Sequence, residues 1–239
     1  MRRTHRQKCA LSEEQRNLGT MSDNCGRRQC PLLQGIYVLA DNTPAPGKSR
    51  SQIARDSLAG GAKIIQLRAK ELARSEFLKL AKEIAKMCIA YDAMFIVNDY
   101  LEIALEVNAC GVHLGEDDLP VAEAKKQAPG LLIGRSTHSL EEAIEIEKQG
   151  ADYIAFGAIF PTATKGRPTP LQGIEKLREV CAEVKKPVVA IGGINRANLA
   201  QVKSAGAAAA AFISEVVCAD SIENRVRELV KIWEKAERD

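Results

Sequence analysis

Cations and carboxylates follow short apolar segments in the first half of this 239-residue chain. The segment QLRAK carries Gln66, Arg68 and Lys70 at alternating positions, so that a strand would place all three on one face. Later segments are followed by an amide and by carboxylates, among them Asp99 and Asp118. Mg²⁺ takes one or two carboxylates and shares its other positions with water and phosphate, while Lys and Arg bind the remaining phosphate charge. These residues therefore predict a place for Mg²⁺ and a polyphosphate.

A second polar group begins in FGAIFPTATKG (156–166), where an apolar run ends in hydroxyls and a lysine instead of a simple turn. Its members are Thr162, Thr164, Lys165, Gly192, Gly193 and Ser214. Glycines let the backbone approach an anion, and the N–H groups at the start of a helix attract it. This group therefore predicts a phosphate site. Two anion sites imply two phosphorylated substrates, or one substrate phosphorylated at both ends.

The elements that must position these residues are short apolar strands that alternate with amphipathic helices from Gly35 onward. The expected strands are residues 35–40, 63–68, 94–99, 111–115, 131–136, 152–160, 187–193 and 209–214. Helical spacing predicts the longest helix over 75–91 and another over 139–149. The second of these begins at Ser139, and Glu142 completes a capping box.

The alternation of strands and helices implies a parallel sheet that is buried on both faces. Eight units in about 205 residues favour a single α/β domain closed as a (β/α)8 TIM barrel over an open, doubly wound sheet. Such barrels build active sites at the carboxyl ends of their strands, where the polar residues lie. Residues 34–239 are therefore expected to be one catalytic domain. Residues 1–33 lack periodicity and are expected to be a disordered extension.

Several of these residues have simpler structural alternatives. Asp99 and Asp118 could each cap the helix that follows. His113 lies inside an apolar strand, where a hydrogen-bonded barrel residue is more common than a ligand. His138 beside Ser136 suggests an activated nucleophile, but the sequence offers no orienting acid. Because the polar groups gather at one end of the strands, a functional site is favoured over scattered caps.

The composition excludes several classes of protein. The chain is 46% hydrophobic and 27% charged, as in ordinary globular proteins. The net charge of +3 is concentrated in residues 1–33, so the remainder is nearly neutral and no nucleic-acid partner is expected. No apolar run reaches the ~18 residues of a membrane span, and the amino terminus lacks a secretory signal. A cytoplasmic location is expected, whereas a homo-oligomer is neither predicted nor excluded.

The seven cysteines are irregularly spaced. Apolar helix or strand settings, which are typical of free core thiols, hold Cys88, Cys110, Cys181 and Cys218. A zinc site near the amino terminus would have to be built, without a C-x-x-C pair, from His5, Cys9, Cys25 and Cys30. The cysteines therefore favour free thiols in a reducing compartment.

Six segments together resemble thiamine phosphate synthases in their order and spacing. They are QLRAK, FIVNDYLEIAL, GVHLGEDDLP, IGRSTHSLEEA, DYIAFGAIFPTATKG and PVVAIGGI. The resemblance extends from about Gly35 to the carboxyl terminus and excludes the 33-residue leader. It is specific because VND, HLG-x-x-D-x-P and PT-x-TK occur in one chain.

The resemblance implies an Mg²⁺-dependent barrel enzyme that joins hydroxymethylpyrimidine diphosphate to hydroxyethylthiazole phosphate, giving thiamine phosphate and pyrophosphate. It implies that Asp99 and Asp118 bind the metal. The expected pyrimidine diphosphate contacts are Gln66, Arg68, Lys70, Asn98, Ser136 and Lys165. The expected thiazole phosphate contacts are Thr162, Thr164, Gly192, Gly193, Ile213 and Ser214. The residues expected to act in the reaction are Arg68, Lys70, Ser136 and Lys165.

Three positions depart from the family pattern. Family members usually have Glu at Ala69, often have Arg at Tyr100, and often have Pro at Ala158. IGRSTHSLEEA also resembles the related thiazole tautomerases, which carry His at Ala158 and lack the paired metal aspartates. Both differences favour the synthase. A non-catalytic sensor of a phosphorylated thiamine precursor is a third alternative, which the retained carboxylates disfavour.

Overall fold

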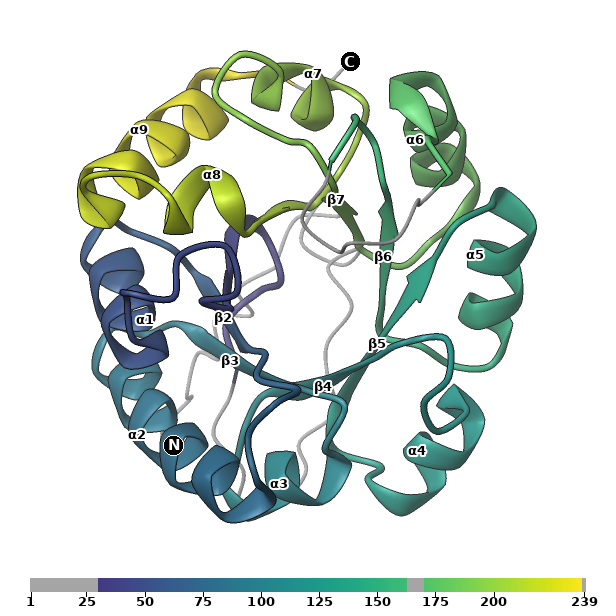
Figure 1. Ribbon diagram of the computed structural model, residues 1–239. Helices are drawn as coiled ribbons and strands as arrows, with labels where there is room; N and C mark the ends of the chain where they lie inside the picture. Colours follow the sequence, from purple (N-terminus) through teal and green to yellow (C-terminus); the bar gives the residue numbers. More distant parts are fainter. Residues whose placement is uncertain (1–29, 163–169, 238–239) are drawn as a thin grey trace, which may run out of the picture.

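The protein folds as a closed barrel of parallel strands surrounded by helices, as a computed structural model shows (Figure 1). The structure describes residues 30–162 and 170–237. Within these ranges the strands follow one another around the barrel in chain order, and the last pairs with the first. The predicted (β/α)8 architecture is confirmed. The expectation of disorder for 1–33 falls almost wholly on residues outside those described.

The strands lie close to the predicted positions. They are β1 (Gly35–Ala40), β2 (Ile64–Leu67), β3 (Met94–Asn98), β4 (Gly111–Leu114), β5 (Leu132–Thr137), β6 (Tyr153–Gly157), β7 (Val188–Ile191) and β8 (Ala209–Phe212). β6 ends three residues before the predicted end, at Gly157. Beyond it, the Ile159 and Phe160 N–H groups still donate to carbonyls that end β7, so the chain remains extended outside the regular ladder.

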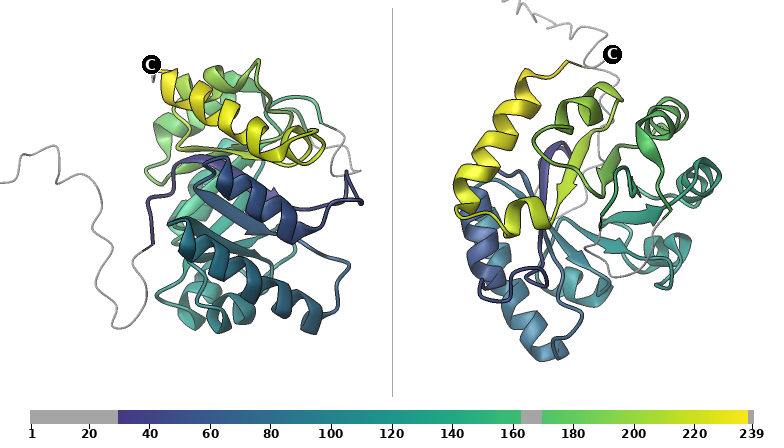
Figure 2. Two further views of the ribbon diagram at one scale, coloured as in Figure 1. Left: turned by 90° about the vertical axis from the view of Figure 1, so that its left-hand side faces the viewer. Right: turned by 45° about the horizontal axis from the view of Figure 1, so that its top comes forward.

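The helices pack around the outside of the ring. They are α1 (Arg50–Ala59), α2 (Arg74–Ala90), α3 (Leu101–Glu106), α4 (Val121–Gln127), α5 (Leu140–Lys148), α6 (Gly173–Glu183), α7 (Leu199–Ser204), α8 (Ser214–Val217) and α9 (Ile222–Lys235). Figure 2 shows α9, in yellow, against α1, in dark blue, so the two ends of the barrel sequence meet in space. No helix in the described ranges is both long and apolar enough to cross a membrane.

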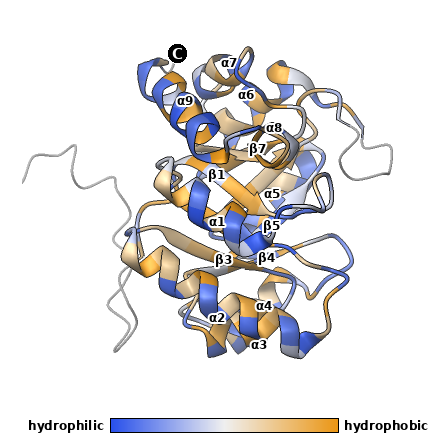
Figure 3. Cartoon of the chain, turned by 60° about the vertical axis from the view of Figure 1, so that its left-hand side comes forward, coloured by the Kyte–Doolittle hydropathy of each residue, from blue (hydrophilic) through white to orange (hydrophobic). Residues whose placement is uncertain are grey.

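Alternation along the strands produces two separate apolar layers. Side chains such as Val38 and Ile65 point outward to the helices, whereas Tyr37 and Ile64 point into the barrel. In Figure 3 the strands are accordingly coloured as mostly hydrophobic. Because the period is two, every second residue of a strand, up to its carboxyl end, faces the barrel axis.

The amino end of the barrel carries a disulfide that the sequence analysis did not predict. Cys30 and Cys110 are bonded, with 5.8 Å between their Cα atoms. Cys110 therefore is not a free core thiol, and Cys30 has a partner other than zinc. The cysteines outside this disulfide in the described part are buried Cys88, half-buried Cys181 and exposed Cys218, so Cys218 was wrongly assigned to the core. The other proposed zinc ligands lie outside the described residues.

The predicted start of α5 is correct, but its capping differs. The Ser139 hydroxyl accepts a hydrogen bond from the Glu142 N–H at 3.1 Å, as expected of an N-cap. The Glu142 carboxylate accepts from the His138 N–H at 2.6 Å instead of returning to Ser139. The reciprocal half of the capping box is therefore shifted by one residue.

Candidate active site

Inward-facing polar side chains converge at the carboxyl ends of the strands. A cavity of about 550 Å³, called here the larger cavity, opens at this end. Its walls include Gln66 from β2, Asn98 from β3, His113 from β4 and Ser136 from β5. All four occupy inward positions of their strands, and three are buried, with Gln66 only 3% exposed. The barrel register thus brings together residues that are far apart in the sequence.

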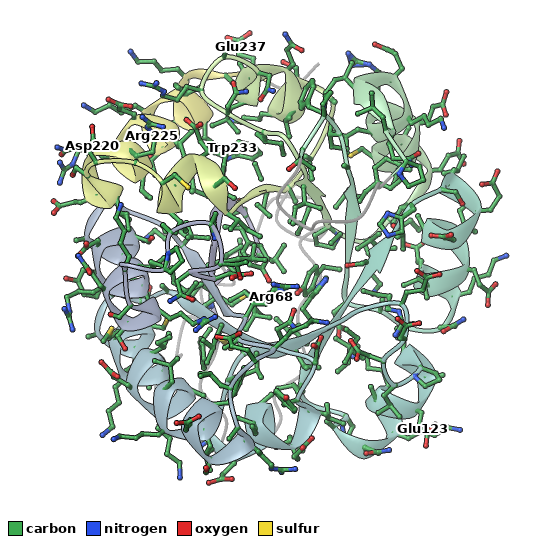
Figure 4. All side chains as sticks on the ribbon, in the orientation of Figure 1. Arg68, Glu123, Asp220, Arg225, Trp233 and Glu237 are labelled. Carbon is green, nitrogen blue, oxygen red and sulfur yellow. A yellow bond between two sulfur atoms is a disulfide. The ribbon has the colours of Figure 1, made fainter. Side chains whose placement is uncertain are left out.

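A buried carboxylate fixes Arg68 at the rim of this cavity. The Arg68 guanidinium pairs with Asp41, which follows β1 and is 2% exposed. Asp41 also accepts a hydrogen bond from the Thr43 N–H at 2.9 Å. Figure 4 shows Arg68 near the centre of the ring, whereas Glu123 lies at its periphery.

Asp41 stays ionised despite its position. Burial alone would raise the pKa of Asp41, but the Thr43 hydrogen bonds and the Arg68 guanidinium outweigh it and hold the pKa below its ordinary value. Sequence reasoning missed Asp41. The signal was available, because Asp41 directly follows the first predicted strand, and Asp99 stands at the carboxyl end of the third.

Asp99 and Asp118 meet at the same rim, after β3 and β4. Burial raises the pKa of Asp99, and so do its hydrogen bond with the Asp118 carboxyl group and the charge of Asp118. Lys70 opposes this shift, with its Nζ 3.2 Å from Asp99 Oδ2. A carboxyl group whose pKa is raised by a neighbouring carboxylate, beside a lysine, marks a place where a divalent cation would be stabilised.

The two aspartates do not cap the helices that follow them. α3 begins after Tyr100 and α4 after Pro120, both without a side-chain cap. Asp118 Oδ2 instead accepts from the Gly115 N–H at 2.5 Å, which folds the loop after β4 back on itself. Arg135 holds the same loop from β5 by donating to the Glu116 carbonyl at 2.8 Å and the Leu119 carbonyl at 3.0 Å. The capping alternatives are therefore wrong.

His113 and His138 have different hydrogen-bond partners. His113 Nε2 lies 2.9 Å from Ser136 Oγ, and Nδ1 lies 3.0 Å from the Tyr153 hydroxyl, so His113 is the hydrogen-bonded barrel residue that was expected. His138 Nδ1 contacts the Gly157 carbonyl at 2.5 Å. Ser136 is thus oriented by His113 and not by its sequence neighbour His138. The suggested pairing of Ser136 with His138 is wrong.

A second cavity of about 290 Å³, called here the smaller cavity, lies at the ends of β6, β7 and β8. Its walls include Thr162, Gly192, Gly193, Ile213 and Ser214. Residues lining both cavities are Ser136, His138, Ala155, Ile191 and Ala211. The two cavities therefore adjoin, as a site for two reacting molecules requires. Thr164 and Lys165 lie outside the described residues.

Backbone geometry at Gly193 makes this cavity dependent on glycine. Gly193 has a φ of 65°, and a Cβ there would lie 2.6 Å from the Phe160 and Pro161 carbonyl oxygens. A side chain at this position would push the end of β7 away from the chain that leaves β6. The described walls of the smaller cavity contain Glu215 but neither Lys nor Arg. Its anion-binding capacity must therefore come largely from N–H groups and hydroxyls.

A pair of arginines neutralises Glu215 and was not foreseen from the sequence. Arg225 Nη1 lies 2.7 Å from Glu215 Oε1, and Arg196 Nε lies 3.5 Å from the same oxygen. The arginines come from α9 and from the loop after β7, so only the closed barrel brings them together. Their charge offsets a carboxylate that would otherwise repel an anion in the smaller cavity.

Comparisons with known proteins agree with this arrangement. Residues 36–216 match the family model described as thiamine monophosphate synthase. A thiamine-phosphate synthase from Methanospirillum hungatei is 48% identical over 79% of this chain and 92% of its own length. The corresponding protein from Pyrococcus abyssi is 46% identical, over 84% and 95%.

Solved structures point the same way. Thiamine phosphate pyrophosphorylase from Pyrococcus furiosus superposes with a TM-score of 0.79 at 41% identity, covering 85% of this chain and 96% of that one. A 3-hexulose-6-phosphate synthase structure superposes with a TM-score of 0.61 at 17% identity, which shows a shared fold alone. Since the family model spans most of the barrel and relatives exceed 40% identity across it, the chain belongs to the thiamine monophosphate synthase family.

Proposed function

We propose that this chain is a transferase that makes thiamine phosphate. Its substrates would be hydroxymethylpyrimidine diphosphate and hydroxyethylthiazole phosphate, and its second product pyrophosphate. The observation that carries the proposal is the pairing of Asp99 and Asp118 beside Lys70 and Arg68, at the mouth of a cavity that adjoins a second, glycine-walled one. A cytoplasmic location belongs to the same proposal.

The donor set at this rim suits Mg²⁺. Mg²⁺ takes one or two carboxylates and completes its octahedron with water and substrate phosphate, and Asp99 and Asp118 supply that number. The charge of Asp118 raises the pKa of Asp99 even with Lys70 beside it, and a divalent cation would relieve this repulsion. When bound, Mg²⁺ would neutralise charge on the departing pyrophosphate.

The cations of the larger cavity would bind the diphosphate. Arg68 is held in place by Asp41, so its guanidinium is available without further reordering. Lys70 is 58% exposed and can turn from Asp99 toward a phosphate. Lys165 is proposed as the third cation from the sequence alone. Asn98 and Gln66 would contact the pyrimidine diphosphate from the wall.

The smaller cavity would bind the thiazole phosphate. Thr162 and Thr164 would supply hydroxyls, and Gly192 and Gly193 would allow a close approach of the backbone. Ile213 and Ser214 would complete the site at the end of β8. This places the thiazole next to the pyrimidine across the shared wall, as two reactants that must meet require.

The reaction needs no protein nucleophile. The bond between the pyrimidinylmethyl carbon and pyrophosphate breaks, both electrons leave with the pyrophosphate, and the thiazole nitrogen donates its lone pair to that carbon. The electron-rich aminopyrimidine ring spreads the positive charge that develops. The chain must therefore hold the leaving group with Arg68, Lys70 and Lys165, align the thiazole and exclude water. Ala155, Ile191 and Ala211 give the shared wall an apolar surface.

The competing functions predict different outcomes in one experiment. The purified full-length chain is incubated with Mg²⁺ and both phosphorylated precursors, and separately with a thiazole carboxylate phosphate. A synthase forms thiamine phosphate and pyrophosphate in equal amounts and leaves the carboxylate unchanged. Isomerisation of the carboxylate would indicate a tautomerase, against which the absence of His at position 158 argues. Binding without any product would indicate a sensor.

A further inference from the structure

A continuous line of hydrogen bonds crosses the barrel interior along the wall of the larger cavity. Gln66 Nε2 donates to the Tyr37 hydroxyl at 2.7 Å, and Tyr37 lies 3.3 Å from the Tyr153 hydroxyl. Tyr153 contacts His113 Nδ1 at 3.0 Å, and His113 Nε2 contacts Ser136 Oγ at 2.9 Å. We propose that this line, called here the relay, has a fixed direction that makes Ser136 a donor and Gln66 an acceptor toward the cavity.

The direction is set at the Gln66 end. An amide nitrogen donates and does not accept, so the Tyr37 oxygen receives this hydrogen bond. The Tyr37 hydrogen is then directed to the Tyr153 oxygen, and the Tyr153 hydrogen to His113 Nδ1. Burial raises the pKa of Tyr37 and Tyr153, so both phenols remain protonated and able to donate.

The consequence appears at the other end of the relay. A neutral histidine that accepts at Nδ1 carries its hydrogen on Nε2. His113 therefore donates to Ser136 Oγ, and the Ser136 hydrogen remains for a group in the cavity. Tyr37 and Tyr153 line the larger cavity and reach Ser136 only through His113, so they act on it as positioning residues.

Gln66 leaves a complementary feature. Its Oε1 is buried and finds no hydrogen-bond partner among the described residues, although Gln66 lines the same cavity as Ser136. An unpaired buried acceptor is costly, which indicates that a ligand N–H group satisfies it. The cavity wall then offers one donor and one acceptor, the pattern that matches an amino group next to a ring nitrogen.

The sequence makes room for the relay at one position. A Cβ at Gly134 on β5 would lie 1.9 Å from Tyr153 Cζ and 2.4 Å from its hydroxyl oxygen. The Tyr153 ring therefore crosses the barrel through space that only glycine leaves open. This explains why a glycine stands inside a strand, where it is otherwise unfavourable.

The specificity part of this inference rests on the proposed function. The relay would favour a 4-aminopyrimidine diphosphate over the 4-oxo analogue, in which the carbonyl accepts and the ring N–H donates. The ring N–H of the 4-oxo analogue would face the Ser136 hydrogen, and its carbonyl oxygen would face Gln66 Oε1. Neither hydrogen bond could then form. A site built for one pattern rejects the other by on the order of 10³-fold or more.

The tautomer of His113 tests the relay without any ligand. Nitrogen-15 NMR of the full-length chain distinguishes the two ring nitrogens, and His5→Gln and His138→Gln variants assign the remaining signal to His113. The relay predicts a neutral ring with its hydrogen on Nε2. A hydrogen on Nδ1, or a doubly protonated ring at neutral pH, would overturn the proposal, because in either case Nδ1 would donate to Tyr153 instead of accepting from it.

A Tyr37→Phe variant tests the specificity. It removes one hydroxyl, keeps the ring, and frees both Gln66 and Tyr153 to reverse. Calorimetric titration with Mg²⁺ should show the 4-amino diphosphate weakened by no more than about fivefold, and the 4-oxo analogue strengthened by about tenfold or more. The control is Tyr91→Phe, at an exposed tyrosine outside the relay, which should leave both affinities unchanged.

The outcomes separate the relay from mere structural support and from the proposed function. A structural role for Tyr37 would weaken both ligands equally, and an unchanged affinity ratio would overturn the relay. If the wild-type chain made no thiamine phosphate, the proposed function would fail, whereas the His113 tautomer would still test the direction of the relay.

Discussion

At the scale of single residues, Asp41 is important to the proposed site although it lies in none of the six segments that resemble thiamine phosphate synthases. It is the buried anion that fixes Arg68 at the rim. Asp41→Asn should keep the Arg68 charge but allow its side chain to move. We therefore expect kcat to fall about tenfold, which is less than removal of the Arg68 cation would cost. Steady-state kinetics should show the KM for the thiazole phosphate unchanged.

The matched control for Asp41 is another aspartate in an ion pair on the same barrel. Asp152 pairs with Lys125 at 2.6 Å, away from both cavities. Asp152→Asn should lower thermal stability without lowering kcat. If Asp41→Asn lost stability but kept its kcat, Asp41 would be a structural residue and not a positioning one.

Asp99 illustrates a conflict between stability and function. Its pKa is raised above the ordinary 3.8, so the unfolded chain ionises at a lower pH than the folded protein does. Stability from this residue therefore falls as pH rises through that window and stays lower at neutral pH. Asp99→Asn removes this cost, and we expect a higher melting temperature than wild type at neutral pH.

The same variant should lose at least about 10²-fold in kcat, because it removes one of the two proposed metal ligands. Calorimetry across pH gives the check on stability. The advantage of Asp99→Asn should disappear below pH 3.8, where the carboxyl is protonated in both states. If Asp99→Asn remained more stable than wild type at that low pH, packing and not charge would explain the difference in stability.

At the scale of elements, the close packing of the chain after β6 against the chain after β7 shapes the smaller cavity. Gly193→Ala would place a methyl group against two carbonyl oxygens at a positive φ. Such a change costs about 1–3 kcal/mol of unfolding free energy. Because the wall moves, we also expect the KM for the thiazole phosphate to rise about tenfold, with the pyrimidine diphosphate nearly unaffected.

Gly173 provides the control, since it also has a positive φ but an added Cβ would meet nothing within 4 Å. Gly173→Ala should lower stability through backbone strain alone. Equal effects of the two variants on the thiazole phosphate KM would show that the close approach at Gly193 does not shape the cavity.

The elements also show why some features were readable from the sequence and others were not. Alternating apolar runs identified all eight strands, because burial on both faces leaves a strong local signal. The carboxyl ends of those strands then located Gln66 and Asn98 without any three-dimensional information. The end of β6 was missed because extended chain beyond Gly157 looks like strand in sequence.

Contacts between residues that are far apart in the chain could not be predicted from the sequence. The relay joins five strands, and its direction depends on which nitrogen of His113 meets which oxygen. Arg196 and Arg225 approach Glu215 only after the barrel closes. The Cys30–Cys110 bond spans 80 residues and contradicted the expectation of free thiols drawn from irregular spacing.

At the scale of the whole molecule, stability and chemistry occupy opposite ends of the barrel. The Cys30–Cys110 bond lies before β4, at the amino end, and ties the start of the described chain to the barrel. Crosslinking a long loop restricts the unfolded chain, so reduction should lower the free energy of unfolding by about 2–4 kcal/mol. Chemical denaturation with and without reductant measures this difference.

Activity provides the counterpart to that measurement. Because the disulfide is remote from both cavities, Cys30→Ser should keep the wild-type kcat while matching the stability of the reduced protein. Reductant should then have no further effect on the variant. A loss of kcat on reduction would show that the amino end controls the site.

We propose above all that Asp99 and Asp118 hold a divalent cation together with pyrophosphate at the mouth of the larger cavity. Calorimetric titration of Mg²⁺ into the full-length chain with saturating pyrophosphate tests it directly. We expect one Mg²⁺ bound per chain, and an affinity at least about 10²-fold weaker after Asp99→Asn and Asp118→Asn are combined. Unchanged Mg²⁺ affinity in the double variant would contradict it.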